Sequence, residues 1–167
     1  ISMTECRTLL YFGAVNYDCH VWVNGKKAGH HVGGFTPFNY DISDLLKKGE
    51  NTVIVKVDNK RHAEDVPTQI FDWWNYGGIT RDVKLVKVPM NYLENYDLQL
   101  KKAANKVKVR ELAFSAKMNA KEAGHQVEVY IPELKLKQQF TTDADGQVSG
   151  VLKVAAKKLQ LWCPENP

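Results

Sequence analysis

A short run of aromatic residues is the part of this sequence whose side chains are best suited to binding chemistry. It reads Phe71, Asp72, Trp73, Trp74, Asn75, Tyr76, Gly77 and Gly78. The aromatic positions do not alternate with polar ones, and a glycine pair ends the run, so we predict a loop. Aromatic faces stack on the C–H faces of sugars, while carboxylates and amides hydrogen-bond to sugar hydroxyls. The candidate sugar-binding residues are therefore Asp72, Trp73, Trp74, Asn75 and Tyr76.

Alternatively, the aromatic side chains could be buried in a hydrophobic core or at an interface with a neighbouring domain. Large aromatic side chains are interior residues more often than they are ligand platforms. A neighbouring domain can also cover such a group of side chains. Composition by itself leaves both interpretations open.

Other groups of potentially reactive residues have weaker support. His30 and His31 are adjacent, so on a strand they point to opposite faces, and no carboxylate or cysteine stands at ligand spacing. His20, His62 and His125 stand singly, which is typical of surface or hydrogen-bonded histidines. No Ser-His-Asp grouping, phosphate-binding loop or dinucleotide fingerprint occurs. We therefore predict no catalytic residue and no metal site.

Composition limits the classes of function. The 167 residues carry 23 Lys and Arg against 19 Asp and Glu, a formal net charge of +4. The lysines stand in scattered pairs, which does not favour nucleic-acid binding. No apolar stretch reaches the about 20 residues that a membrane-spanning helix needs, so we expect no membrane partner. Three cysteines without a Cys-x-x-Cys pair leave the redox compartment open.

A period of two in the apolar residues predicts β-strands in the first half of the chain. Residues 17–23 alternate and lead into Asn24-Gly25, the pair that a type I′ hairpin turn prefers. Residues 52–57 form a further predicted strand with its valines on one face. Between them, residues 41–46 predict one helical turn, capped by Asp41 or Ser43.

The second half repeats this pattern. Residues 126–131 and 147–154 alternate on either side of a predicted turn at 143–146. The apolar set of residues 107–118 changes from odd to even positions, which predicts a β-bulge near Arg110-Glu111. Seven or so short strands in this half are typical of an immunoglobulin-like sandwich.

Several motifs resemble the N-terminal sugar-binding domain of glycoside hydrolase family 2. They occur in the family's order between residues 9 and 88, and the last contains the family's Gly-Ile-x-Arg-x-Val pattern. They are residues 21–29, 33–38, 41–42, 49–59 and 73–83. Farther on, residues 96–98 and the terminal run 161–167 are similar to the family's immunoglobulin-like domain.

The resemblance implies an all-β fold of two domains. Residues 1–89 correspond to a partial jelly-roll sandwich whose N-terminal strands are missing, and residues 90–167 to an immunoglobulin-like β-sandwich, divided near Pro89. In β-galactosidases, β-glucuronidases and β-mannosidases of the family, a (β/α)₈ barrel follows and holds two catalytic glutamates. Such enzymes retain configuration, with the two carboxylates about 5 Å apart. Glu165-Asn166-Pro167 has the residue types of the family's Asn-Glu-Pro motif in the wrong order.

The resemblance thus implies the non-catalytic N-terminal segment of an exo-β-glycosidase. We expect a β-galactosidase by breadth of occurrence, although residues 75–79 resemble the β-glucuronidase branch. Its partners would be carbohydrate and its own catalytic barrel. The segment would need no cofactor, while the parent enzyme could hold Na⁺ or Mg²⁺ and could be oligomeric. The alternatives are a carbohydrate-binding module without catalysis and a structural spacer whose Trp73 and Trp74 dock against the barrel.

The resemblance also carries over individual residues. Asp58 and Asn59 follow the strand that ends at Val57, where the family places a polar residue that lines the substrate or ion site. The alternative role for Asp58 is a strand-end turn residue that satisfies its own backbone. Arg81 and Asp82 are expected to form an ion pair that fixes the aromatic loop.

Overall fold

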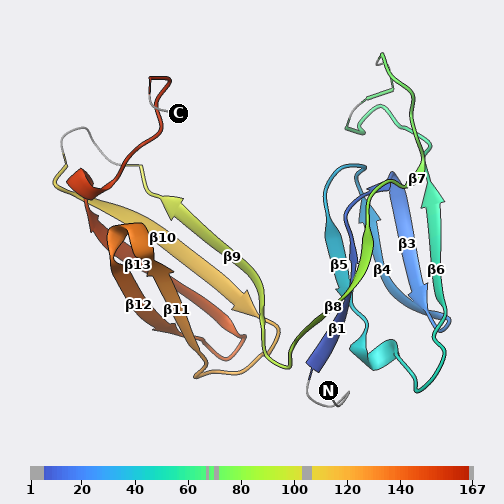
Figure 1. Cartoon of the computed structure of the whole chain (residues 1–167), viewed down its shortest axis with the longest axis horizontal. Helices are drawn as coiled ribbons and strands as arrows, with labels where there is room; N and C mark the ends of the chain where they lie inside the picture. Colours follow the sequence, from blue (N-terminus) through green and yellow to red (C-terminus); the bar gives the residue numbers. More distant parts are fainter. Residues whose placement is uncertain (1–5, 67, 70–71, 103–106, 166–167) are drawn as a thin grey trace. The chain divides into compact units, whose positions relative to one another are not determined.

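The protein is described by a computed structural model that covers residues 6–66, 68–69, 72–102 and 107–165. Its backbone contacts divide the chain into two compact units between Met90 and Asn91. Each unit consists of antiparallel strands and single 3₁₀ turns (Figure 1). None of the helices in the described ranges has the length and apolar character needed to cross a membrane.

The first unit contains two three-stranded sheets and one short ribbon. The sheets have the orders β5-β1-β8 and β4-β3-β6, and β2 pairs with β7 in the ribbon. The strands are β1 (Cys6–Phe12), β2 (Val15–Asn16), β3 (Asp18–Val23), β4 (Lys26–Val32), β5 (Phe38–Asp41), β6 (Val53–Asp58), β7 (Gly78–Ile79) and β8 (Val83–Pro89).

One core joins the two sheets of the first unit. Alternate residues of β3 are fully buried, and they pack with Leu10 and Phe12 of β1. The residues between them on β3, Asp18, His20 and Trp22, face outward. The predicted alternation is therefore confirmed, and it produces a β-sandwich because each sheet has one apolar face.

The predicted hairpin is also confirmed. Asn24 and Gly25 join β3 to β4, and both have positive φ angles, of 51° and 79°. The Asn24 side chain supports its surroundings as well, since its Nδ2 donates to the carbonyl oxygen of Leu45 at 2.9 Å and its Oδ1 accepts from the amide of Thr52 at 3.0 Å. This turn therefore also fixes the segment that leads into β6.

The predicted helical turn exists, but its cap differs from the prediction. The 3₁₀ turn η1 covers Ser43–Leu45, and Ile42 occupies the N-cap position without a side-chain hydrogen bond. Asp41 is the last residue of β5, paired with Leu9, so it lies one residue too early to be the cap. Its carboxylate instead accepts from the amide of Ser43 at 3.0 Å.

The second unit packs a three-stranded sheet, β13-β10-β9, against the β11-β12 hairpin. Its elements are β9 (Leu93–Leu100), β10 (Val109–Met118), β11 (Gln126–Ile131), η2 (Pro132–Leu134), β12 (Leu136–Thr141), β13 (Gln147–Ala155) and η3 (Ala156–Lys158). Phe114 and Phe140 meet between the layers, with ring centroids 5.2 Å apart. A Cβ at Gly150 would lie 2.0 Å from the Phe140 ring, so glycine is required for this close approach.

Two expectations for the second unit are wrong. The described part of this unit contains five strands instead of about seven. The pairing of β10 with β13 runs without a shift from Val109 to Lys117, so no bulge lies at Arg110-Glu111. The apparent change of period arises because Val107 precedes the strand and Val109 is exposed at its end. The irregularity in β10 lies between Lys117 and Met118.

Candidate functional site

Three asparagine side chains hold the aromatic loop against the end of the first sandwich. Asn75 Nδ2 donates to the carbonyl oxygen of Asn59 at 2.7 Å, and Asn59 Nδ2 donates back to the carbonyl oxygen of Asn75 at 3.2 Å. Asn16 Nδ2 donates to Asn75 Oδ1 at 2.9 Å and to the carbonyl oxygen of Tyr76. The loop backbone is therefore tied both to the end of β6 and to β2.

Glycine makes this junction sterically possible. A Cβ at Gly77 would lie 2.7 Å from the Asn59 side chain, and one at Gly34 would lie 2.6 Å from Asn16 Oδ1. Real Cβ atoms do not approach other atoms so closely, so these close contacts require glycine at both positions.

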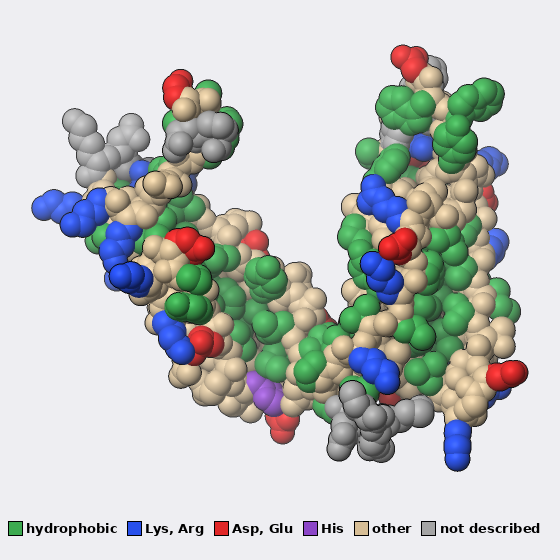
Figure 2. All heavy atoms as spheres, in the orientation of Figure 1, with side chains coloured by type: hydrophobic (Ala, Val, Ile, Leu, Met, Phe, Trp, Pro, Cys, Tyr) green, Lys and Arg blue, Asp and Glu red, His purple; other side chains and the backbone are tan. Residues whose placement is uncertain are grey.

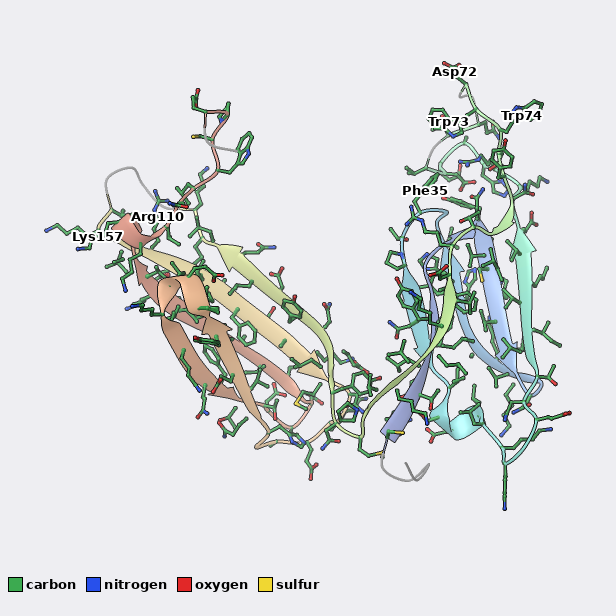
Figure 3. The ribbon with its side chains drawn as sticks, in the orientation of Figure 1. Phe35, Asp72, Trp73, Trp74, Arg110 and Lys157 are labelled. Atoms are coloured by element: carbon green, nitrogen blue, oxygen red, sulfur yellow. The ribbon has the colours of Figure 1, made fainter. Side chains whose placement is uncertain are left out.

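The rings of the loop point outward. Trp74 is 80% exposed and Tyr76 72% exposed, and Trp73 and Phe35 are each more than half exposed. Figure 2 shows hydrophobic side chains gathered at this end of the first unit. In Figure 3, Asp72, Trp73 and Trp74 lie at the tip of the loop, beyond Phe35. The rings are not part of the core of the first unit, so packing within that unit does not explain them.

The loop borders a hollow of about 260 Å³. Aromatic residues and asparagines line it, together with Arg61 and Arg81. The lining includes no carboxylate among the described residues, so the hollow offers groups that bind and orient, and no acid–base pair. Aromatic faces beside amides and guanidinium groups suit a polar ring with hydroxyl or anionic substituents.

The predicted ion pair between Arg81 and Asp82 is not present. Arg81 Nη1 donates to the carbonyl oxygen of Phe35 at 3.2 Å, whereas Asp82 pairs with Lys84 at 3.3 Å. The two neighbouring side chains therefore have different partners, and no hydrogen bond or ion pair joins them. Arg81 therefore connects the segment before β8 to Phe35 through a backbone carbonyl oxygen.

Asp58 lies in a different hollow from the aromatic loop. Its Oδ1 accepts from the amide of Lys60 at 2.9 Å, which is the turn role that we considered as its alternative. It also lines a hollow of about 200 Å³, together with Asp18, His20 and Asp65. The structure thus brings Asn59 and Asn75 together, but it separates Asp58 from the rings. Asp72 is exposed and lines neither hollow.

Sequence reasoning missed three residues of the site. Asn16 is only 5% exposed, and its Oδ1 is buried without a hydrogen-bond partner. Phe35 and Arg61 also line the aromatic hollow. Phe35 lies within the motif at residues 33–38, which could have pointed to it, whereas Asn16 and Arg61 lie outside the motifs and reach the site through contacts between distant segments.

The structure confirms one prediction about the histidines and corrects another. His31 stacks on Phe38, whereas His30 stacks on His20 at 4.1 Å between ring centroids, so the expected opposite orientation of His30 and His31 is confirmed. His20 does not stand alone, because Asp18 lies 3.2 Å from its Nε2. Burial, and next the positive charge of His30, lower the pKa of His20 below its ordinary value.

The first unit also contains a buried thiol. Cys19 is fully buried in the core. Burial raises its pKa to about 11, with the negative charge of Asp18 adding to the effect. The thiol therefore stays protonated near neutral pH and acts as a packing residue.

The comparisons with known proteins agree on one family. Residues 1–89 match the family model described as the sugar binding domain of glycosyl hydrolases family 2. A putative beta-glucuronidase of Formosa agariphila is 41% identical over 95 residues, which are 57% of this chain and 12% of that protein. A beta-galactosidase of Clostridium acetobutylicum is 37% identical over 89 residues, which are 53% of this chain and 10% of that protein. The chain thus spans about a tenth of the length of these relatives.

Solved structures share the fold across both units. A beta-glucuronidase of Bifidobacterium dentium superposes with a TM-score of 0.75 at 20% identity, covering 98% of this chain and 32% of that one. A putative beta-galactosidase of Bacteroides fragilis superposes with a TM-score of 0.72 at 25% identity, covering 92% of this chain and 25% of that one. The β-sandwich folds of both units are therefore shared with these larger proteins.

Proposed function

Because the chain belongs to glycosyl hydrolase family 2, we propose that it is the accessory, sugar-facing part of a longer β-glycosidase. In this proposal the two sandwiches do not perform the hydrolysis. The first unit contributes the aromatic loop to a sugar pocket, and a separate catalytic domain supplies the two carboxylates. The family match and the small share of each relative that the chain covers support this division of roles.

The exposed but anchored aromatic loop carries the proposal. Side chains as exposed as Trp74 and Tyr76 give up apolar contacts that folding would otherwise provide, yet their backbone is fixed by the asparagine hydrogen bonds. A loop whose backbone is fixed before binding loses less conformational entropy when a sugar stacks on its rings. The arrangement therefore suits binding to a partner outside the first unit.

The substrate is the finer part of the proposal. We expect a terminal β-galactoside, as predicted from the sequence, and one observation favours a β-glucuronide as the second candidate. Arg61 and Arg81 are among the residues that line the hollow, and their positive charge complements the carboxylate of a uronic acid. The curated relatives include proteins named beta-galactosidase and beta-glucuronidase.

Kinetics of the longer protein test the role of the loop. Its reading frame should continue beyond Pro167 and encode an Asn-Glu-Pro at a predicted strand end. In that protein Trp74→Ala should raise KM for the nitrophenyl β-glycoside that it cleaves by about tenfold. The reason is that a sugar stacking on one aromatic ring contributes about 1 kcal/mol or slightly more to binding. Trp162→Ala is the matched control, since Trp162 is equally exposed but belongs to the second unit. Unchanged KM and kcat in Trp74→Ala would contradict the proposal.

Assays of the purified chain distinguish an accessory role in a longer enzyme from an independent role in sugar binding. Purified alone, it should not turn over nitrophenyl β-galactoside, β-glucuronide or β-mannoside, and turnover that survives extensive purification would refute the non-catalytic role. Titration with oligosaccharides addresses the alternative of an independent binding module. Millimolar or tighter binding that is lost in Trp74→Ala would favour that alternative, whereas absence of binding favours a loop that acts only beside the catalytic domain.

A further inference from the structure

Three potential metal ligands gather on the outer face of the β3-β4 hairpin. Asp18 and His20 stand two residues apart on β3, and His30 is the cross-strand partner of His20 on β4. Because side chains alternate along a strand, all three project from the face opposite to the buried Cys19 and Val21. Their side chains are between 29% and 42% exposed, so solvent reaches the group.

The spacing of the ligand atoms matches a metal centre. His20 Nε2 lies 3.2 Å from Asp18 Oδ1, and His30 Nε2 lies 3.1 Å from the same oxygen. One ligand atom from each residue can be chosen so that all lie within 4.8 Å of one another. Metal–nitrogen and metal–oxygen bonds of about 2.0–2.1 Å at tetrahedral angles place neighbouring ligand atoms roughly 3.3 Å apart. The two measured distances are close to this value.

We propose that Asp18, His20 and His30 form a binding site for a first-row transition-metal dication, with Zn²⁺ as its best-fitting ion. Two imidazole nitrogens and one carboxylate suit Zn²⁺, Ni²⁺ and Cu²⁺ better than Mg²⁺ or Ca²⁺, which prefer oxygen ligands. Three protein ligands leave a fourth position for water or for a group from another molecule. The site lies apart from the aromatic loop, so the proposal does not depend on the function proposed above.

The hairpin holds two of the ligands in place before an ion binds. His20 and His30 face each other in register, and their rings stack with an angle of 9° between the planes. The type I′ turn at Asn24-Gly25 closes this hairpin, and the buried residues of β3 fix its orientation on the core. The ion therefore requires small ring rotations and no change of the backbone.

Nearby charges act in both directions. Lys56 stands opposite His20 on β6, and Lys27 also acts on His20, so their positive charges oppose a dication. Asp58 stands opposite Asp18 on β6 and contributes negative charge on the same face. The positive charges of the two lysines thus offset the negative charges of the two carboxylates, which predicts a moderate affinity for a dication. The site should therefore favour an ion that bonds strongly to imidazole over one that is held by charge alone.

Calorimetric titration with ZnCl₂ tests the site on the full chain. The background variant should carry Cys6→Ser and Cys163→Ser, because these thiols are partly accessible and would bind Zn²⁺ themselves. One Zn²⁺ per chain is expected, with no displacement by excess Mg²⁺. His30→Asn and Asp18→Asn should each lower the affinity for Zn²⁺ by at least about tenfold. Mutation of a residue that only hydrogen-bonds to a metal ligand already weakens metal binding by about that factor, and loss of a ligand should weaken it at least as much.

The chain offers a matched control. His125 Nε2 lies 3.4 Å from Glu122 Oε2, which provides one histidine and one carboxylate without a second histidine. His125→Asn should leave Zn²⁺ binding unchanged. Amide spectra of each variant establish that the hairpin is folded, and shifts of the His20 and His30 ring signals on addition of Zn²⁺ locate the ion. Absence of binding, or binding that persists in both His30→Asn and Asp18→Asn, would overturn the proposal.

Discussion

The two sandwiches close over their cores to different degrees. In the first unit Phe12, Val21 and Val23 are completely buried, whereas in the second unit Leu152 is completely buried but Leu112 and Met118 remain 8% and 9% exposed. The first unit places two three-stranded sheets face to face, while the second places three strands against two. A wider pair of sheets covers its central residues more completely, so the first core is the better sealed of the two.

The difference has a consequence for function. The better sealed unit is also the one that carries the aromatic loop, the hollow beside it and the His20–His30 cluster. Polar groups and exposed rings add little stability by themselves, so a rigid scaffold is needed to hold them in position. In this chain the candidate binding residues are therefore carried by the unit with the better sealed core.

Truncation of core residues is expected to give the largest effects and tests the comparison directly. Phe12→Ala should lower the free energy of unfolding of the first unit by about 3–5 kcal/mol, since it opens a cavity in a fully packed core. Leu152→Ala, at a completely buried residue of the second unit, should cost about 2–5 kcal/mol.

Hydrogen exchange under increasing urea measures both variants. Amides of β1 and β3 should lose protection in Phe12→Ala while those of β10 and β13 keep it, and the reverse should hold for Leu152→Ala. Equal loss of protection in both units from either variant would show that the two sandwiches do not behave as separate cores.

A turn in the second unit should give an intermediate effect. Gly146 has a φ of 72°, and a Cβ there would lie 2.1 Å from the carbonyl oxygen of Ala120. Gly146→Ala should therefore cost about 1–3 kcal/mol through backbone strain and the steric clash. Gly124→Ala separates the two causes, because Gly124 has a φ of 96° but no atom within 4 Å of its Cβ position. Equal urea midpoints for the two variants would show that the contact with Ala120 has no cost.

The smallest expected effect concerns an ion pair of the first unit and its dependence on pH. Burial would raise the pKa of Asp41, but hydrogen bonds from Arg7 and Ser43 outweigh burial and lower it below the ordinary 3.8. A lowered pKa in the folded state means that the carboxylate stabilises the fold at pH values above 3.8. This contribution is lost as the pH falls through the folded-state pKa.

Asp41→Asn should consequently destabilise the first unit by about 1 kcal/mol at neutral pH. The difference from the unsubstituted protein should shrink below pH 3.8, as measured by urea unfolding at several pH values. Asp44→Asn is the control, since Asp44 contacts the same arginine from an exposed position and should have a smaller effect. A difference between Asp41→Asn and the unsubstituted protein that does not change with pH would exclude the ion pair as its cause.

Local chemistry made much of the fold predictable. Asn24-Gly25 specifies its turn because both residues tolerate positive φ, and the alternation along β3, β11 and β13 follows from one face being apolar. The predicted bulge at Arg110-Glu111 was wrong because an exposed valine at a strand end has the same appearance in sequence as a change of face. The apolar period of a strand indicates burial only for residues that the opposite sheet covers, and Val109 at the end of β10 is exposed.

The candidate site was only partly predictable. The aromatic loop was found from its composition, and the exposure of Trp73, Trp74 and Tyr76 distinguishes it from a core segment. The ion pair predicted for Arg81 and Asp82 is absent because each residue has another partner: Asp82 pairs with the nearby Lys84, and Arg81 donates to the carbonyl oxygen of the distant Phe35, a contact that has no sequence signature.

The sequence alone determined the class of fold, the hairpin turn, the aromatic loop and the family resemblance, because turn preferences, periodicity and motif order are encoded by neighbouring residues. Only the tertiary structure decided that Asn16 supports the loop, that Asp58 and the rings occupy different hollows, and that His20 meets His30 beside Asp18. Each of these depends on the register between strands or on contacts between distant segments. Such contacts are set by the packing of the whole sandwich, and no local pattern records them.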